Sequence, residues 1–69
     1  SKEVQLFQAS SEGDLTTLQK LIQNGLKIDT KGQLNRTPLH LACLNGQLEI
    51  CIFLVDSGAD KNAIDNSGQ

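Results

Sequence analysis

The sequence repeats itself after 33 residues, and this period constrains the fold more than any other feature. Leu39 follows Leu6 at that distance, and Gly46 follows Gly13 in the same way. The other matched pairs are Ala9 and Ala42, Leu15 and Leu48, Leu21 and Leu54, and Gly25 and Gly58. A fixed period of this size is typical of repeat proteins, in which each unit is one supersecondary element that stacks on the next. The chain is therefore expected to fold as a short stack of similar units.

The first unit has the apolar spacing of two helices. Residues 2–11 predict a helix with a short and imperfect apolar face, which Gly13 ends. Asp14 is expected to cap a second helix, because its carboxylate accepts backbone N–H groups of the next turn. Asn24 and Gly25 end this helix, since both tolerate the left-handed conformation. The apolar residues are Val4, Leu6, Phe7 and Ala9 on the first helix and Leu15, Leu18, Leu21 and Ile22 on the second.

The second unit repeats this plan with clearer signals. Thr37 is a good N-cap, and Pro38 suits the first helical position, where its missing N–H costs nothing. A second helix is expected over residues 48–56. The pairs Asn45-Gly46 and Ser57-Gly58 end the two helices, whose packed side is expected to comprise Leu39, Leu41, Ala42 and Cys43, then Ile50, Cys51, Leu54 and Val55.

The segments between and after the units lack a helical period. Residues 26–36 are interpreted as an extended excursion with a tight turn, and residues 59–69 match them in phase. Gly68 falls where Asn35 falls, and both residue types tolerate a positive φ. A turn is therefore predicted at both positions.

These motifs resemble those of the ankyrin-repeat family. The second unit carries the residues in register: Thr37-Pro38-Leu39-His40-Leu41-Ala42, Gly46, Glu49, Leu54, Gly58-Ala59-Asp60 and Asn62-Ala63. The first unit keeps the apolar and glycine positions but has Val4-Gln5-Leu6-Phe7 in place of the Thr-Pro-Leu-His turn, as an N-terminal capping repeat would. The resemblance implies an all-α solenoid fragment made of two helix-turn-helix repeats joined by a hairpin-like loop.

The resemblance also predicts how the chain is divided. Residues 1–31 are expected to form the capping repeat, residues 32–64 the second repeat, and residues 65–69 the start of a third. Because repeat arrays generally need about three units for stability, we expect this segment to be the N-terminal part of a longer array.

Composition excludes several classes of function. The chain has a net charge of −2, two Phe, and no Trp or Tyr, so it offers neither a basic surface nor stacking rings for nucleic acid. Apolar runs are too short to span a bilayer, and a signal-peptide pattern is absent from the N-terminus. We therefore expect no nucleic-acid or membrane partner and a cytoplasmic or nuclear location.

His40 and Cys43 are the sharpest catalytic candidates, because residues three apart on a helix are neighbours. Cys43 is nonetheless expected on the packed side of its helix, where a thiol is inert, and the resemblance implies a structural His40 that ties the helix start to the loop by hydrogen bonds. Cys43 and Cys51 could pair, but small buried thiols in a reducing compartment are the simpler interpretation. One histidine and two cysteines cannot complete a zinc site. We assign no catalytic residue, cofactor or metal, and expect no enzyme.

The resemblance assigns a partner-binding face to loop tips and to the exposed side of the first helix of each pair. Its residues are Ser11, Glu12, Lys31, Gln33, Leu34, Arg36, Leu44, Asn45, Ile64, Asn66 and Gln69. Leu34, Leu44 and Ile64 fall outside the helical stripes, so they are candidate exposed apolar contacts. Ile64 alternatively packs on a further repeat, and Ile52 is either a second contact or an ordinary surface residue. Lys27, Lys31 and Arg36 make the segment of residues 26–36 basic, which would steer an acidic partner.

Binding another protein, with no cofactor or small-molecule substrate, is the function that the resemblance implies. The chain is then either part of a dedicated interaction protein or a regulatory or targeting segment of a multidomain enzyme, channel or transcription factor. Asn62 occupies a position that asparaginyl hydroxylase modifies in some repeats of this kind. Lys61 replaces an aliphatic residue beside it, so a structural bond from Asn62 to the loop backbone is favoured.

Overall fold

Helices form at every place where the repeat predicts one. The computed structural model describes residues 1–68, in which α1 spans Lys2–Glu12, α2 Leu15–Gln23, α3 Pro38–Leu44 and α4 Leu48–Asp56, with a 3-10 turn, η1, at Gln33–Asn35. This confirms the all-α fold class. In the described part of the chain, every helix is too short or too polar to cross a bilayer.

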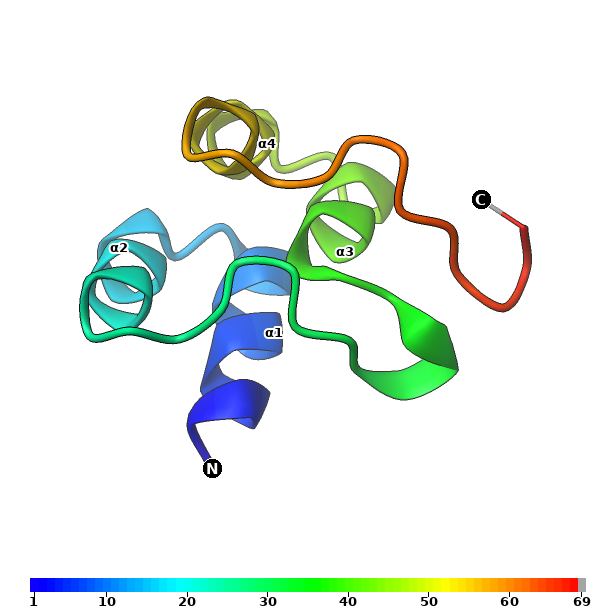
Figure 1. Cartoon of the computed structure of the whole chain (residues 1–69). Helices are drawn as coiled ribbons and strands as arrows, with labels where there is room; N and C mark the ends of the chain where they lie inside the picture. The colour runs from blue at the N-terminus through cyan, green and yellow to red at the C-terminus, as the bar shows by residue number, and fades with distance from the viewer. Residues whose placement is uncertain (69) are drawn as a thin grey trace.

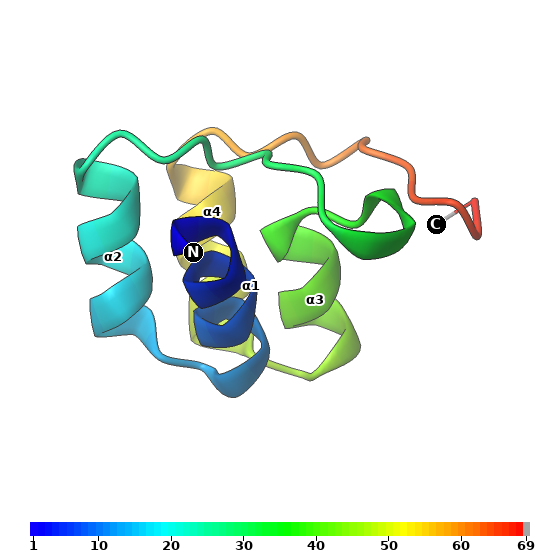
Figure 2. The same ribbon diagram turned by 90° about the horizontal axis from the view of Figure 1, so that it is seen from below.

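The helices lie in two layers (Figure 1). α1 packs against both α2 and α3, and α3 packs against α4. α1 and α3 therefore make one layer, and α2 and α4 make the other. The long segments that follow α2 and α4, residues 26–36 and 59–68, run along the same end of the helices, as Figure 2 shows. We call these segments the first loop and the second loop.

The core is aliphatic and spans both units. Leu6, Leu18 and Leu54 are 0% exposed and Ile50 is 1% exposed. Ala9 and Ala42, which occupy the same position in the two units, belong to the same cluster, and their small side chains suit the close approach of α1 and α3. Val4, predicted on the apolar face of α1, is instead 61% exposed, whereas Ser10 is fully buried and its hydroxyl donates to the Leu6 carbonyl at 2.8 Å.

Local capping signals act as the sequence predicts. The carboxylate of Asp14 accepts hydrogen bonds from the Thr17 N–H at 3.2 Å and the Thr17 hydroxyl at 2.7 Å. Thr37 caps α3 with Pro38 at its start, and a capping box forms because the His40 ring also bonds back to the Thr37 backbone. The structural role of His40 is thereby confirmed.

The tight turn of the first loop is more strained than expected. Asn35 has a φ of 58°, as predicted, and Gly68 has a φ of 80°. Leu34 also has a positive φ, at 59°, which a leucine rarely adopts. The strained turn holds the apolar side chain of Leu34 out of the core, at 52% exposed.

Candidate functional site

The two loops are joined by hydrogen bonds between residues about one repeat apart. The Asp60 N–H donates to the Asp29 carboxylate at 3.0 Å, the Lys31 ammonium to the Ile64 carbonyl at 3.3 Å, the Asn66 N–H to the Leu34 carbonyl at 2.8 Å, and the Asn35 amide to the Asn66 side chain at 2.9 Å. These bonds fix the second loop on the first. The loop residues predicted to meet a partner are therefore ordered before any partner arrives.

An ion pair adds to this loop contact. The Arg36 Nε lies 3.3 Å from the Asp65 Oδ2, and the Asp65 side chain is only 2% exposed. Asp65 also accepts a hydrogen bond from the Ser67 N–H at 2.8 Å. Arg36, 29% exposed, thus directs its charge inward to a buried carboxylate. Lys27 and Lys31 are the basic residues that the first loop leaves exposed.

A groove of about 490 Å³ lies between α1, the tip of the first loop and α3. Its apolar lining includes Val4 and Leu34, which are 61% and 52% exposed. Its lining residues are Val4, Phe7, Gln8 and Ser11 on α1, Gln33, Leu34 and Arg36 in the loop, and Leu41 on α3. Four residues of the predicted face, Ser11, Gln33, Leu34 and Arg36, are brought together here. The other four lining residues, Val4, Phe7, Gln8 and Leu41, were missed, because sequence spacing does not show which helix faces meet at a groove.

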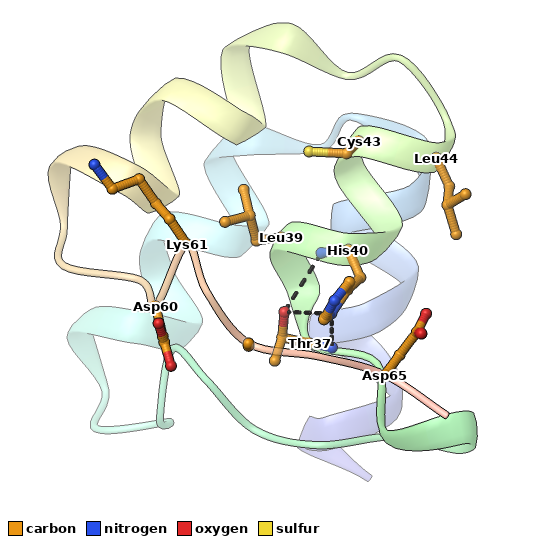
Figure 3. Close-up of a pocket in the computed structure, with 9 residues that line it drawn as sticks. Thr37, Leu39, His40, Cys43, Leu44, Asp60, Lys61 and Asp65 are labelled. Atoms are coloured by element: carbon orange, nitrogen blue, oxygen red, sulfur yellow. Dashed lines mark hydrogen bonds between the residues drawn. The ribbon is translucent and has the colours of Figure 1, made fainter. Parts of the chain in front are cut away.

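A second opening of about 320 Å³, which we call the α3 pocket, lies on another side of α3 (Figure 3). It is lined by Thr37, Leu39, His40, Cys43 and Leu44 on and before α3, and by Asp60, Lys61, Ala63 and Asp65 in the second loop. Leu44, 56% exposed, therefore borders a different opening from Leu34. The predicted face is divided between two openings.

The other predicted contact residues lie outside both openings. Glu12 is exposed at the end of α1, and the Asn45 side chain donates to the Leu41 carbonyl at 2.8 Å. Ile64 is 63% exposed, and Asn66 is held by Asn35. Gln69 lies outside the described residues.

His40 and Cys43 are not arranged as a base and a nucleophile. The Nδ1 of His40 accepts a hydrogen bond from the Thr37 N–H at 3.0 Å. The Cys43 sulfur points away from the His40 ring and lies 3.4 Å from the Cys51 sulfur (Figure 3). The ring is thus engaged in capping α3, and the thiol faces a second thiol.

The expectation that both thiols are buried is wrong. Cys43 is exposed and Cys51 is partly exposed. Ser10, which precedes Cys43 by one period, is 0% exposed in α1, which packs against α3. In residues 1–68, α3 packs against α1 and α4, and Cys43 meets Cys51 of α4. Burial and the neighbouring Cys43 thiol raise the pKa of Cys51 to about 11.

Comparisons with known proteins agree with the helical repeat fold. A family model for ankyrin repeats in three copies matches residues 6–69. The chain is 43% identical over 60 residues to palmitoyltransferase akr1 of Schizosaccharomyces pombe, a match that covers 86% of this chain and 9% of that protein. It is 33% identical over 63 residues to human protein phosphatase 1 regulatory subunit 27, covering 91% of this chain and 41% of the relative. Human ankyrin repeat domain-containing protein 40 is 30% identical over 69 residues, which is 99% of this chain and 19% of that protein. The chain thus spans less than half the length of each of these relatives.

Proposed function

The chain belongs to the ankyrin-repeat family, and we propose that it binds another protein through the groove between α1, α3 and the tip of the first loop. Ankyrin repeats are a protein-interaction module. The proposed module is non-catalytic and takes no cofactor. It presents the loop tip and the helix face to an extended segment of the partner.

The groove is the single observation that carries this proposal. Val4 and Leu34 border it with more than half of each side chain exposed, beside the polar groups of Gln8, Ser11 and Gln33. Exposed apolar groups rimmed by polar ones often mark contact sites. The fitting occupant is a peptide segment that inserts one apolar side chain between these residues.

The rigidity of the loops supports the same function. The first loop is bonded to the second through main-chain groups of Leu34 and Ile64. A preordered surface binds with little change of shape, so less conformational entropy is lost on association. The exposed ammonium groups of Lys27 and Lys31 favour a partner segment that carries acidic residues.

A second candidate function is that of a regulatory or targeting segment within a larger protein. In two of the relatives, the segment that matches this chain is a minor part of a larger protein. It covers 9% of a palmitoyltransferase and 41% of a phosphatase regulatory subunit, which favours this second candidate. Sequencing the parent transcript beyond Gln69 tests it. A catalytic or membrane domain in the same reading frame would support this candidate, and a reading frame of repeats alone would refute it.

The groove is tested with a displayed library of short random peptides selected on the folded chain. The peptide with the highest affinity is synthesised with a fluorophore, and its Kd is measured by anisotropy. A Val4→Thr and Leu34→Asn double variant should weaken binding at least about tenfold, because it removes exposed apolar contacts. Asparagine tolerates the positive φ of position 34, so the backbone of the turn is kept.

The matched control is a Leu48→Gln and Ile52→Thr double variant. It removes an equal number of exposed apolar side chains, but from α4 in the other layer. Binding within about twofold of the parent is expected for this control, with circular dichroism showing both variants folded. Equal affinity of the parent and the groove variant would refute the groove as the binding site.

A further inference from the structure

We propose that Leu34 determines which partner the groove selects, and that a strained turn holds its side chain there although the strain lowers the stability of the fold. The partner side chain that fits beside Leu34 is aliphatic or aromatic. Since it concerns the groove, this proposal rests on the function proposed above.

The turn at the tip of the first loop has a conformation that suits asparagine and glycine. Leu34 has a φ of 59° and a ψ of 22°, and Asn35 has a φ of 58°. The Arg36 N–H donates to the Gln33 carbonyl at 3.2 Å across these two residues. A turn whose two central residues both have a positive φ strongly prefers Asn-Gly, because a β-carbon is crowded in this region. Leucine at the first of these positions therefore strains the backbone.

Hydrogen bonds from both loops hold Leu34 in this conformation. Within the first loop, the Gly32 N–H donates to the Arg36 carbonyl at 2.9 Å, and the Asn35 N–H donates to the Gly32 carbonyl at 3.1 Å. From the second loop, the Asn66 N–H donates to the Leu34 carbonyl at 2.8 Å. A strained residue persists only where its surroundings fix it in this way, and such residues cluster at functional sites.

The second loop makes the corresponding turn without this strain. Ser67 and Gly68 occupy the positions of Leu34 and Asn35 one period later. Gly68 has a φ of 80°, whereas Ser67 is not among the residues of positive φ in the described part of the chain. A turn at this position of the repeat therefore does not require a left-handed residue where Leu34 stands, and the strain is particular to the first loop.

Packing in the core does not explain why a leucine occupies this position. Leu34 is not part of the aliphatic core cluster, and it is 52% exposed even with the second loop bonded to its carbonyl. For stability alone, asparagine or glycine would suit the position better. The leucine side chain borders the groove with Val4, Phe7 and Leu41. It therefore offers an apolar contact to a partner.

The floor beside Leu34 favours an apolar side chain over a charged one. A β-carbon at Gly32 would lie 2.7 Å from two ring atoms of Phe7, so the loop passes directly against this ring, which lines the groove. Arg36 is the one charged residue of the lining, and its Nε already faces Asp65. A charged partner side chain inserted here would lose water without an equivalent partner, whereas an apolar one would bury its surface against Phe7 and Leu34.

Three substitutions of Leu34 separate the effect of the side chain from that of the backbone. Leu34→Met keeps an apolar side chain and the strain. Leu34→Ala removes the apolar side chain but keeps the β-carbon and thus the strain. Leu34→Asn removes the apolar side chain and relieves the strain. Thermal midpoints are measured by circular dichroism, and Kd values by anisotropy with the fluorescent peptide selected on the parent chain.

Stability should follow the backbone, and affinity should follow the side chain. Leu34→Asn should unfold at least about 4 °C above both the parent and Leu34→Ala, because asparagine accepts the left-handed conformation. Leu34→Met should bind within about twofold of the parent. Leu34→Asn and Leu34→Ala should both bind at least about fivefold more weakly.

Selectivity is measured with a second peptide, in which serine replaces the apolar residue that an alanine scan shows to contribute most. The parent should prefer the original peptide by at least about tenfold, and Leu34→Asn by less than about threefold, because the two apolar side chains contact each other. A merely structural role of Leu34 would leave this ratio unchanged, and an unchanged ratio would overturn the proposal.

Two further results would overturn it while the groove remains the binding site. One is a midpoint of Leu34→Asn no higher than that of Leu34→Ala, which would show that the turn stores no strain. The other is a Leu34→Asn variant that binds as tightly as the parent while Val4→Thr binds more weakly. A selection that yields no peptide, or equal affinity of the parent and the double variant at Val4 and Leu34, would overturn the proposed function as well.

Discussion

Gly58 ends α4 with a φ of 97°, in the left-handed region that favours glycine. Apart from Gly58 itself and its two chain neighbours, no heavy atom lies within 4 Å of the place where a β-carbon would stand, so a side chain there meets open space. A substitution at this residue therefore lowers stability only through strain in the backbone.

We expect Gly58→Val to lower the free energy of unfolding by about 1–2 kcal/mol, because a β-branched residue resists this conformation. The free energy of unfolding should fall less for Gly58→Asn, since asparagine adopts the left-handed conformation more readily. Urea unfolding followed by circular dichroism measures both. Equal stability of the two variants would contradict the backbone explanation.

Residue-level signals that act within a few positions were readable from the sequence. Asp14, Thr37 and Pro38 act at helix starts as predicted, and the bounds expected for the helix over residues 48–56 agree with α4. The positive φ of Leu34 was not readable, because leucine has no intrinsic preference for it. It depends on bonds made by the turn as a whole, including that from the Asn66 N–H to the Leu34 carbonyl.

At the scale of the element, the stability of α3 depends strongly on the hydrogen bonds at its N-terminus, because the helix has only 7 residues. A helix this short is marginal by itself. The Thr37 hydroxyl accepts from the His40 N–H at 3.4 Å, and the His40 ring accepts from the Thr37 N–H at 3.0 Å. The reciprocal pair satisfies donors that the first turn would leave without a helical partner.

Thr37→Ala should therefore lower the free energy of unfolding by about 1 kcal/mol, a typical loss for an N-cap. In a chain of this size the thermal midpoint should fall by about 4–8 °C. Thr37→Ser keeps the hydroxyl and is the control in thermal unfolding by circular dichroism. A Thr37→Ala midpoint equal to that of Thr37→Ser would show that the cap contributes nothing measurable.

Contacts between elements were the least predictable part of the candidate site. Arg36 and Asp65 are 29 residues apart, and the sequence presents Arg36 only as a loop cation. The exposure of Cys43 likewise depends on which helix covers α3. The apolar spacing within α3 does not predict this. The boundaries 1–31, 32–64 and 65–69 stay a prediction, as does the face residue list.

At the scale of the whole molecule, a single aliphatic cluster joins both units, and Leu6 lies in it with 0% exposure. Replacing such a residue by alanine typically costs about 2–5 kcal/mol. A single core of this size supplies only about 3–5 kcal/mol in total.

We therefore expect Leu6→Ala to unfold most of the population at 25 °C, as seen by loss of helical circular dichroism. Leu48→Ala, at a residue 73% exposed, should change the free energy of unfolding by less than about 0.5 kcal/mol. A folded Leu6→Ala chain of parental stability would show that the two units do not share this core.

The bonds between the loops also bear on how such a protein can diverge over generations. The carbonyl groups of Leu34 and Ile64 accept the bonds, whereas their side chains take no part in them. A lineage can exchange these side chains by point mutation while the hydrogen bonds that order the loops stay the same. Variation at these two positions is thereby uncoupled from the bonds that order the loops, so the side chains offered to a partner there can change without a new fold.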